Sequence, residues 1–210
     1  MQKEEFFEEY LNAITHYIGA GIAFLGLIIL IIHSIKIGEK NYIIGCIIFS
    51  IGLIFMYLMS GTYHMLKMGK LKKTFRILDH ISIYVSISSA YTPYIFTVLS
   101  GKIKWIIFFA QWGLTSFGVI FKLFFTGRFK LVSTLIYLFM GWMIVFIFKD
   151  IKSNINTTSL NYLIACGVTY SIGAFIYMSK NLKFSHTIWH LFVIGGSIFN
   201  FLSIYYLPVF

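Results

Sequence analysis

The sequence has little charge: only 11% of its 210 residues are Asp, Glu, Lys or Arg, whereas 59% are hydrophobic. Soluble globular domains carry about a quarter charged residues, so this composition excludes that class. Acidic residues are the scarcest charged group, and four of the seven lie together near the N-terminus, as Glu4, Glu5, Glu8 and Glu9. A secretory signal begins with a basic region, so we expect the first apolar stretch to be retained.

Cysteine and proline are also rare, with two of each. Cys46 and Cys166 stand alone inside apolar stretches, where thiols pack as small hydrophobic groups, so we expect neither a disulfide nor a cysteine-bound metal. Pro93 lies inside another apolar stretch and is expected to kink a helix, because it removes a backbone hydrogen bond. No internal repeat or low-complexity linker divides the chain, so we predict one domain over residues 1–210.

Long apolar stretches account for nearly the whole chain. A helix needs about 20 apolar residues to cross a bilayer, and short polar segments separate seven such stretches. They lie at about 13–35, 42–66, 77–99, 105–125, 131–148, 160–178 and 186–207. We therefore predict an all-α fold, a polytopic membrane protein built as a seven-transmembrane-helix bundle. Residues 1–12 form a short acidic segment before it, which we interpret as an amphipathic helix at the membrane surface.

Lysine and arginine are distributed unequally between the two ends of these spans. The N-terminal side carries eleven: Lys3, Lys67, Lys70, Lys72, Lys73, Arg76, Lys122, Arg128, Lys130, Lys180 and Lys183. The other side carries six: Lys36, Lys40, Lys102, Lys104, Lys149 and Lys152. Because basic residues concentrate in cytoplasmic loops, we predict a cytoplasmic N-terminus and a C-terminus outside the cell.

The net charge of +10 follows from these loop residues. It favours contact with anionic membrane lipids and does not indicate nucleic-acid binding. The high content of isoleucine and lysine is typical of a bacterium with an AT-rich genome. We therefore expect a multi-pass protein of a bacterial plasma membrane.

Four ionisable residues lie at the ends of the predicted spans, where polar groups are costly. His64 closes the second span, Asp79 opens the third, and His186 and His190 open the last. The predicted topology places all four at the cytoplasmic ends of their helices. Ionisable residues in or beside a membrane span mark candidate functional sites.

The histidines have the spacing of a metal site. His186 and His190 are four residues apart, which puts both on one face of a helix, and His64 is a candidate third ligand. Catalytic zinc has three protein ligands and an open position for water. Iron, copper and nickel also accept imidazole, so the metal itself stays open at this point. The alternative is that each histidine only hydrogen-bonds another helix.

A zinc ion with an open position activates water and polarises a carbonyl group, which suits hydrolysis of an amide or ester. Asp79 is the candidate general base, and Ser60, one turn before His64, is a candidate partner of Asp79 or of an oxyanion. A lipid is the expected substrate, because lipids reach a membrane-embedded site readily. We interpret His80 and His33 as interfacial residues. We interpret His16 as structural, and the alternative is that it supports the site indirectly or lines a substrate channel.

The motifs taken together resemble those of the hemolysin III family, the bacterial branch of the progestin and adipoQ receptor superfamily. The matching stretches run in the family's order: Asn12–Ala20, Ser60–His64, Leu78–Tyr84, Ala90–Tyr94 and His186–Phe192. The resemblance implies a seven-helix bundle with a cytoplasmic N-terminus. It also implies zinc held by His64, His186 and His190, with Asp79 beside the metal-bound water and Ser60 close to it.

The resemblance also bears on the activity. The superfamily is similar in these motifs to alkaline ceramidases, and its adiponectin-receptor branch is associated with ceramide hydrolysis. We therefore expect a zinc-dependent hydrolase that cleaves a carbon–nitrogen amide bond, or an ester, of a lipid. The family name implies an alternative, a pore-forming cytolysin, although no span has the continuous polar face of a water-filled pore. A third hypothesis is a membrane sensor in which zinc only holds helices together and catalyses nothing, which we call the clamp function. The long N-terminal region of the animal receptors is absent, which argues against a receptor role.

Overall fold

The computed structural model describes residues 2–179 and 182–207, and the surroundings of every side chain within them except residues 2, 3 and 130. All of the regular structure in these ranges is helical. The elements are α1 (Gln2–Ile37), α2 (Lys40–Met65), α3 (Lys70–Thr97), α4 (Gly101–Phe125), α5 (Lys130–Trp142), the 3-10 helix η1 (Met143–Ile147), α6 (Phe148–Asn154), α7 (Thr157–Met178) and α8 (Ser185–Tyr205). Because α5, η1 and α6 follow one another directly, the described chain forms the seven long helical segments predicted.

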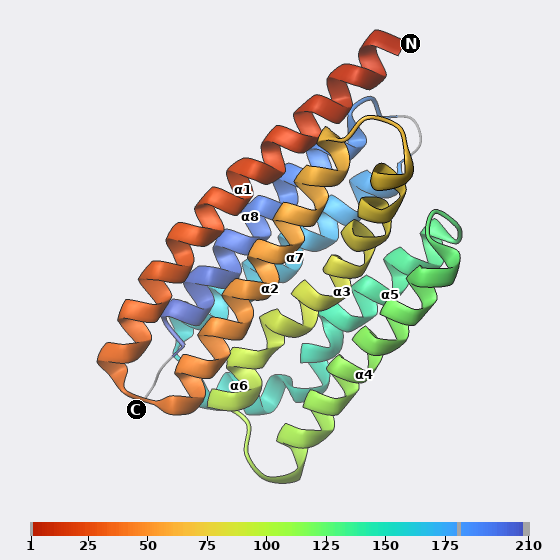
Figure 1. The fold of residues 1–210 in the computed structure, drawn as a ribbon. Coiled ribbons are helices and arrows are strands. Elements are labelled where there is room, and N and C mark those ends of the chain that lie inside the picture. Colours follow the sequence, from red (N-terminus) through yellow and green to blue (C-terminus); the bar gives the residue numbers. More distant parts are fainter. Residues whose placement is uncertain (1, 180–181, 208–210) are drawn as a thin grey trace.

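Within the described residues, six helical segments are long and apolar enough to cross a membrane, so this is a polytopic membrane protein. The segment that does not qualify is α3. It carries five ionisable residues in its first ten positions, Lys70, Lys72, Lys73, Arg76 and Asp79. Even so, α3 packs between α2 and α4 in the bundle (Figure 1).

Several predicted loops are partly helical. The basic stretch 67–76 was expected to be a loop, but α3 already begins at Lys70; likewise, α4 begins at Gly101, and α6 and the start of α7 occupy most of the predicted loop 149–159. Lys122 was counted among the basic loop residues on the same side as the N-terminus. It is instead buried in α4, where its ammonium group donates to Ser133. Lys180, from the same set, lies outside the described residues.

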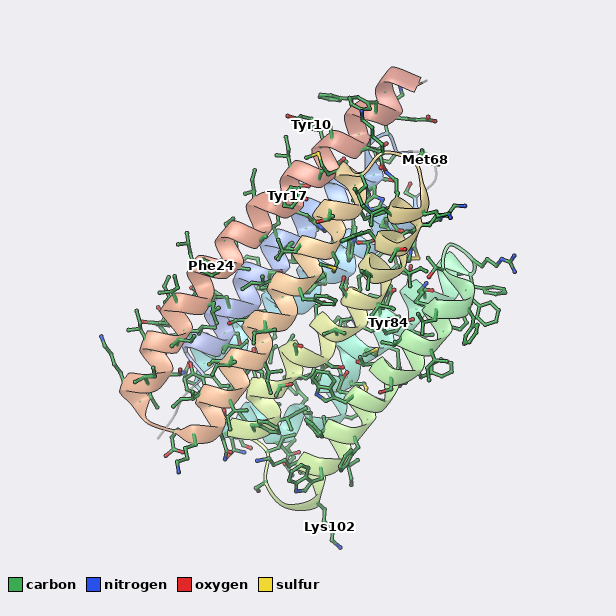
Figure 2. All side chains as sticks on the ribbon, viewed as in Figure 1. Tyr10, Tyr17, Phe24, Met68, Tyr84 and Lys102 are labelled. Carbon is green, nitrogen blue, oxygen red and sulfur yellow. The ribbon has the colours of Figure 1, made fainter. Side chains whose placement is uncertain are left out.

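We had predicted that the acidic segment 1–12 forms a helix of its own at the membrane surface. Residues 2–12 are instead the first part of α1, which continues without interruption to Ile37. Tyr10, Tyr17 and Phe24 project outward from this helix (Figure 2), and all three are exposed. The outer face of α1 therefore presents large apolar groups along its length, as a helix in contact with lipid does.

The ends of the helices fix where the polar residues meet. The start of α1, the end of α2 and the starts of α3 and α8 lie at one end of the bundle (Figure 1). The last turn of α8 lies at the opposite end (Figure 1). His64, Asp79, His186 and His190 are consequently at the same end of the molecule, as the sequence predicted.

Small residues bring α2 and α3 into close contact. A Cβ atom built on Gly45 would lie 2.7 Å from the Cα atom of Pro93, and one on Gly52 would lie 2.2 Å from the Ser89 hydroxyl oxygen. Pro93 stays inside α3, which continues to Thr97. Glycine at these two positions therefore sets the distance between the helices.

A tyrosine of α3 supports the change from α5 to the 3-10 helix η1. The Tyr91 hydroxyl donates to the Gly141 carbonyl oxygen (2.6 Å) and accepts from the Ile144 N–H (2.8 Å). Backbone groups released by such a change must find partners, since lipid offers none. Tyr91 supplies both and joins α3 to the fifth segment.

The substitution Gly45→Ala tests the α2–α3 contact. The added methyl group would meet a backbone atom, which cannot rotate away, so we expect a loss of about 1–3 kcal/mol in the free energy of unfolding. Thermal unfolding in detergent measures this as a lower midpoint. Gly113→Ala in α4 is the matched control, because no described atom beyond the glycine's immediate chain surroundings lies within 4 Å of its added Cβ. Equal midpoints for the two variants would contradict the close contact.

Candidate metal centre

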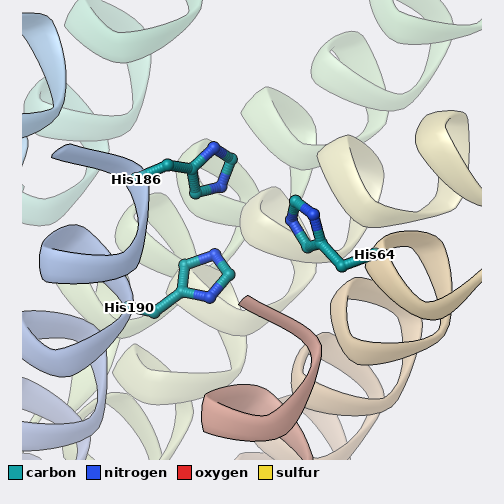
Figure 3. Close-up of side chains that lie close together, drawn as sticks. All are labelled: His64, His186 and His190. Carbon is teal, nitrogen blue, oxygen red and sulfur yellow. The ribbon is translucent and has the colours of Figure 1, made fainter. Parts of the chain in front are cut away.

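Three histidines from two helices converge at the end of the bundle where α1, α3 and α8 begin and α2 ends, which we call the polar end. His64 lies in the last turn of α2, and His186 and His190 lie one turn apart at the start of α8. One ligand atom from each lies within 4.8 Å of the other two, and the rings face one another in Figure 3. The structure therefore brings together the three predicted ligands into a group that can hold a metal ion.

This group of histidines is more buried than a cluster of residues on the protein surface would be. His64 is 4% exposed and His190 is 1% exposed, while His186 is half-buried. The His64 ring centroid lies 4.9 Å from that of His186 and 5.3 Å from that of His190, and the rings are steeply inclined. Inclined rings at these separations direct several nitrogen atoms toward one point without stacking.

The partners of His64 determine which nitrogen is available. Its Nδ1 atom lies 3.2 Å from Oε1 of Glu9, on α1. A carboxylate accepts hydrogen bonds, so Nδ1 carries the proton and Nε2 keeps its lone pair. That Nε2 atom is buried and has no hydrogen-bond partner among the described residues.

His190 is held in a similar way by α1. Its Nδ1 atom lies 3.2 Å from the Asn12 carbonyl oxygen and 3.2 Å from the Thr15 hydroxyl oxygen. The Thr15 hydroxyl donates to the Leu11 carbonyl (2.9 Å), so it accepts from His190. Nε2 of His190 is therefore the nitrogen left for a ligand. Metal-binding histidines have this arrangement, with the second nitrogen donating to a carboxylate or carbonyl, so the donor set fits a metal ion.

Asp79 and Ser60 lie beside the three histidines. Both are buried, and the Asp79 carboxylate interacts with the side chains of Ser60 and His80. Asp79 does not belong to the tight group of three histidine ligand atoms. The structure thus brings all five predicted site residues to one end of the bundle, whereas their roles stay predictions.

His80 and His33 were both predicted to be interfacial; His80 also contacts the predicted site residue Asp79. His80 is partly exposed at the edge of the site, with Nδ1 2.7 Å from the Arg76 carbonyl and 3.4 Å from Asp79 Oδ2. His33 stacks on Tyr205, with ring centroids 4.0 Å apart, near the other end of the bundle.

His16 lies closer to the site than expected. Its ring stacks on that of His190, with centroids 3.5 Å apart and planes inclined by 18°. It is buried, and neither ring nitrogen has a hydrogen-bond partner among the described residues. A stacked ring restricts the orientation of His190, so His16 contributes to the geometry of the site.

The sequence analysis missed the contribution of α1. We had interpreted Glu9 as part of a surface helix, but it contacts His64 through Oε1 and accepts from the Lys72 ammonium group through Oε2. Spacing could have identified it. Glu9, Asn12 and His16 lie three and four residues apart, which places all three on one face of a helix.

An apolar cavity of about 320 Å³ lies between α1, α2 and α8. Its lining residues are Gly19, Ile22, Ala23, Leu25, Gly26, Ile29, Phe49, Ser50, Leu53, Tyr57, Ile194, Ser197, Ile198, Phe201 and Leu202. The Tyr57 ring contacts the edge of His16, with centroids 5.2 Å apart. The Tyr57 ring therefore stands between the cavity and His16, whose ring stacks on His190 of the histidine cluster.

Comparison with known proteins agrees with the motifs. The sequence profile of the family described as "Haemolysin-III related" matches residues 4–201. The chain is 40% identical to "Hemolysin-3" of Bacillus cereus over 203 residues, covering 96% of this chain and 93% of that protein. It is 37% identical to "Hemolysin-3 homolog" of Bacillus subtilis (strain 168) over 190 residues, covering 90% and 89%.

The relatives extend to animals. "Monocyte to macrophage differentiation factor" of Homo sapiens is 26% identical over 209 aligned positions, covering 95% of this chain and 84% of that protein. No solved structure matches the chain. The family match spans nearly the whole sequence, and it includes every residue of the histidine cluster. The chain therefore belongs to the haemolysin III family, as its motifs indicated.

Proposed function

We propose that this protein is a zinc-dependent membrane hydrolase that cleaves an amide or ester bond of a lipid. The observation that carries the proposal is the group of three imidazoles from α2 and α8, whose ligand atoms lie within 4.8 Å of one another. His64 offers this group a buried nitrogen that has no hydrogen-bond partner among the described residues. Three neutral imidazoles suit zinc and leave a coordination position open.

His64, His186 and His190 would hold the ion. When bound, zinc supplies a Lewis acid that polarises a carbonyl oxygen and makes a water molecule acidic near neutral pH. The protein's contribution is to fix the three rings, through Glu9 on His64 and through Asn12 and Thr15 on His190. Rings fixed in this way offer one set of lone pairs, which favours one coordination geometry.

Asp79 is the residue we assign as general base. Its carboxylate is buried next to His64 and is held by Ser60 and His80. It would accept the proton of the attacking water and later deliver it to the leaving amine or alkoxide. We assign Ser60 to the orientation of Asp79, because its hydroxyl lies at that carboxylate and is itself buried.

The lipid substrate is supported by the surroundings of the site. The cavity that begins at Tyr57 is lined almost wholly by apolar side chains, which suits an acyl chain better than a polar metabolite. The amide or ester group would then lie at the polar end of the bundle, near the histidines. The excess of basic residues at that end supports a cytoplasmic site, and the bacterial relatives support a plasma membrane location.

Two relatives carry the name hemolysin, which favours a pore as the alternative function. The described polar side chains argue against a pore within one copy of the chain. Tyr57 donates to Ser197 (2.9 Å), which in turn contacts Tyr170 (2.9 Å), and Ser88 contacts Thr115 (2.6 Å). Polar groups that pair across helices in this way close the interior of the bundle to water.

The metal content of the purified protein tests the site directly. We expect about one zinc ion per chain in the wild type by elemental analysis in detergent. His190→Ala should lose the ion, because it removes a ligand at the centre of the cluster. His33→Ala is the matched control and should keep it, since His33 lies near the other end of the bundle.

Two results would contradict the metal site. One is a wild-type protein that retains no metal after purification in metal-supplemented buffer without chelators. The other is equal metal content in the wild type and in His190→Ala. Either result would favour a bundle in which the histidines only bond one another.

The substitution Asp79→Asn tests the assigned base. It keeps the size of the side chain but removes its ability to accept a proton, so we expect zinc content to be unchanged and kcat to fall by roughly 100-fold or more. Release of fatty acid from labelled long-chain acyl amides and acyl esters measures this. Asp150→Asn in α6 is the matched control, because Asp150 is exposed.

Undiminished turnover in Asp79→Asn would exclude Asp79 as the base. A wild-type protein that binds zinc but cleaves none of the lipids would instead favour the clamp function. In that case, removal of zinc with a chelator should lower the thermal midpoint of the protein while leaving it inert toward every lipid.

A further inference from the structure

The acidic start of α1 reaches over the histidine cluster from a helix that supplies no ligand. Glu9 lies 3.2 Å from Nδ1 of His64 through one carboxylate oxygen and accepts from the Lys72 ammonium group through the other. It therefore connects α1, α2 and α3 at the site. We propose that Glu9 is a positioning residue for the metal: it holds His64 with Nε2 directed toward the ion and so sets the affinity of the whole site.

The argument rests on the two nitrogens of His64. A neutral imidazole carries one N–H, and a carboxylate can only accept, so the contact with Glu9 places the proton on Nδ1. The ring cannot then turn by 180° without losing this bond. Without Glu9, both tautomers and both ring orientations become available, and only a fraction of molecules would present Nε2 correctly. A carboxylate that accepts from a ligand histidine also makes the ligand more basic.

Glu9 is kept in place by the packing of α1 against α8. The Thr187 hydroxyl donates to Asn12 Oδ1 (2.6 Å), one turn after Glu9. On the other side of Glu9, the Phe7 ring contacts Phe184 edge-on, with centroids 6.3 Å apart. These contacts fix the helix both before and after Glu9, so the backbone that carries the carboxylate does not depend on the bonds of Glu9 for its position.

The two buried ligands differ in a way that makes the proposal testable. The His190 Nδ1 atom is held by the Thr15 hydroxyl and by the backbone carbonyl of Asn12, and no side-chain substitution removes the carbonyl. The His64 Nδ1 atom is held by the Glu9 side chain. Glu9 is therefore a position at which a single substitution can release a ligand ring while every ligand remains.

This inference rests on the metal-binding part of the proposed function and does not depend on hydrolysis. Its test is the affinity for Zn²⁺, measured by competition with a chromophoric chelator on the full-length protein in detergent. The variants are Glu9→Ala and Glu9→Gln. Glu5→Ala, in the same acidic segment, is the matched control because Glu5 is exposed and its loss changes the net charge equally.

We expect Glu9→Ala to bind Zn²⁺ about 10–100-fold more weakly than the wild type. Glu9→Gln should lie between the two, because its amide oxygen can still accept from Nδ1 but carries no charge. Glu5→Ala should stay within twofold of the wild type. The side chain of Glu9 is 37% exposed, so its ion pair with Lys72 adds little to folding.

Cobalt substitution provides a readout that a merely structural role would not move. The visible absorption bands of bound Co²⁺ report the ligand geometry, and we expect them to shift in Glu9→Ala but not in Lys72→Met, which leaves the contact with His64. Equal Zn²⁺ affinity and equal spectra in Glu9→Ala and the wild type would overturn this proposal alone. A wild-type protein that binds no Zn²⁺ would overturn it together with the metal site.

Discussion

A buried polar group in this bundle can find a hydrogen-bond partner only on its own or a neighbouring helix, because lipid provides none. This constraint sets which helices touch. Tyr94 of α3 meets Asn200 and Ser203 of α8, and Tyr91 of α3 meets the Gly141 carbonyl in α5 and the Ile144 N–H in η1. Gly45 lets the backbone of α2 approach that of α3 closely. The long helix α3, which is too polar to qualify as a span by composition, contacts α2, α4, α5 and α8.

Unpaired polar atoms gather at the histidine cluster. Seven buried side-chain atoms have no hydrogen-bond partner among the described residues: Nε2 of His64 and both nitrogens of His16 lie together, and the other four belong one each to His33, Tyr84, Thr97 and Trp112. Unpaired polar atoms are costly in an interior, and a bound ion or water is one way in which they are satisfied. These unpaired nitrogens lie next to Asp79 and Ser60 and near an apolar cavity. This grouping favours a ligand-binding site over an accidental lack of hydrogen-bond partners.

The sequence predicted much of this arrangement from length and spacing alone. Apolar stretches of about 20 residues identify the helical segments, and the four-residue spacing of His186 and His190 predicts their shared face. The role of Glu9 was missed, because a carboxylate near a chain end has the composition of a solvated surface; its spacing from Asn12 and His16 indicates a shared helix face but not the partner that this face meets. Only the long-range packing of α1 against α2 and α8 turns that residue toward His64. Lys122 was misjudged for the same reason, since its partner Ser133 belongs to another helix.

The length of α1 has a consequence for the depth at which the proposed metal site would lie in the membrane. A helix of 36 residues is about 54 Å long, whereas the hydrocarbon layer is about 30 Å thick. The surplus, with its four glutamates, must therefore extend into the headgroup layer and the water beyond. The histidines that contact Glu9 and Asn12 would then lie at the boundary between the hydrocarbon layer and the headgroup layer. The bond between the headgroup and the acyl chain of a lipid lies at the same depth. A lipid could present that linkage by lateral diffusion within its own leaflet, and a hydrophilic product could leave on the aqueous side.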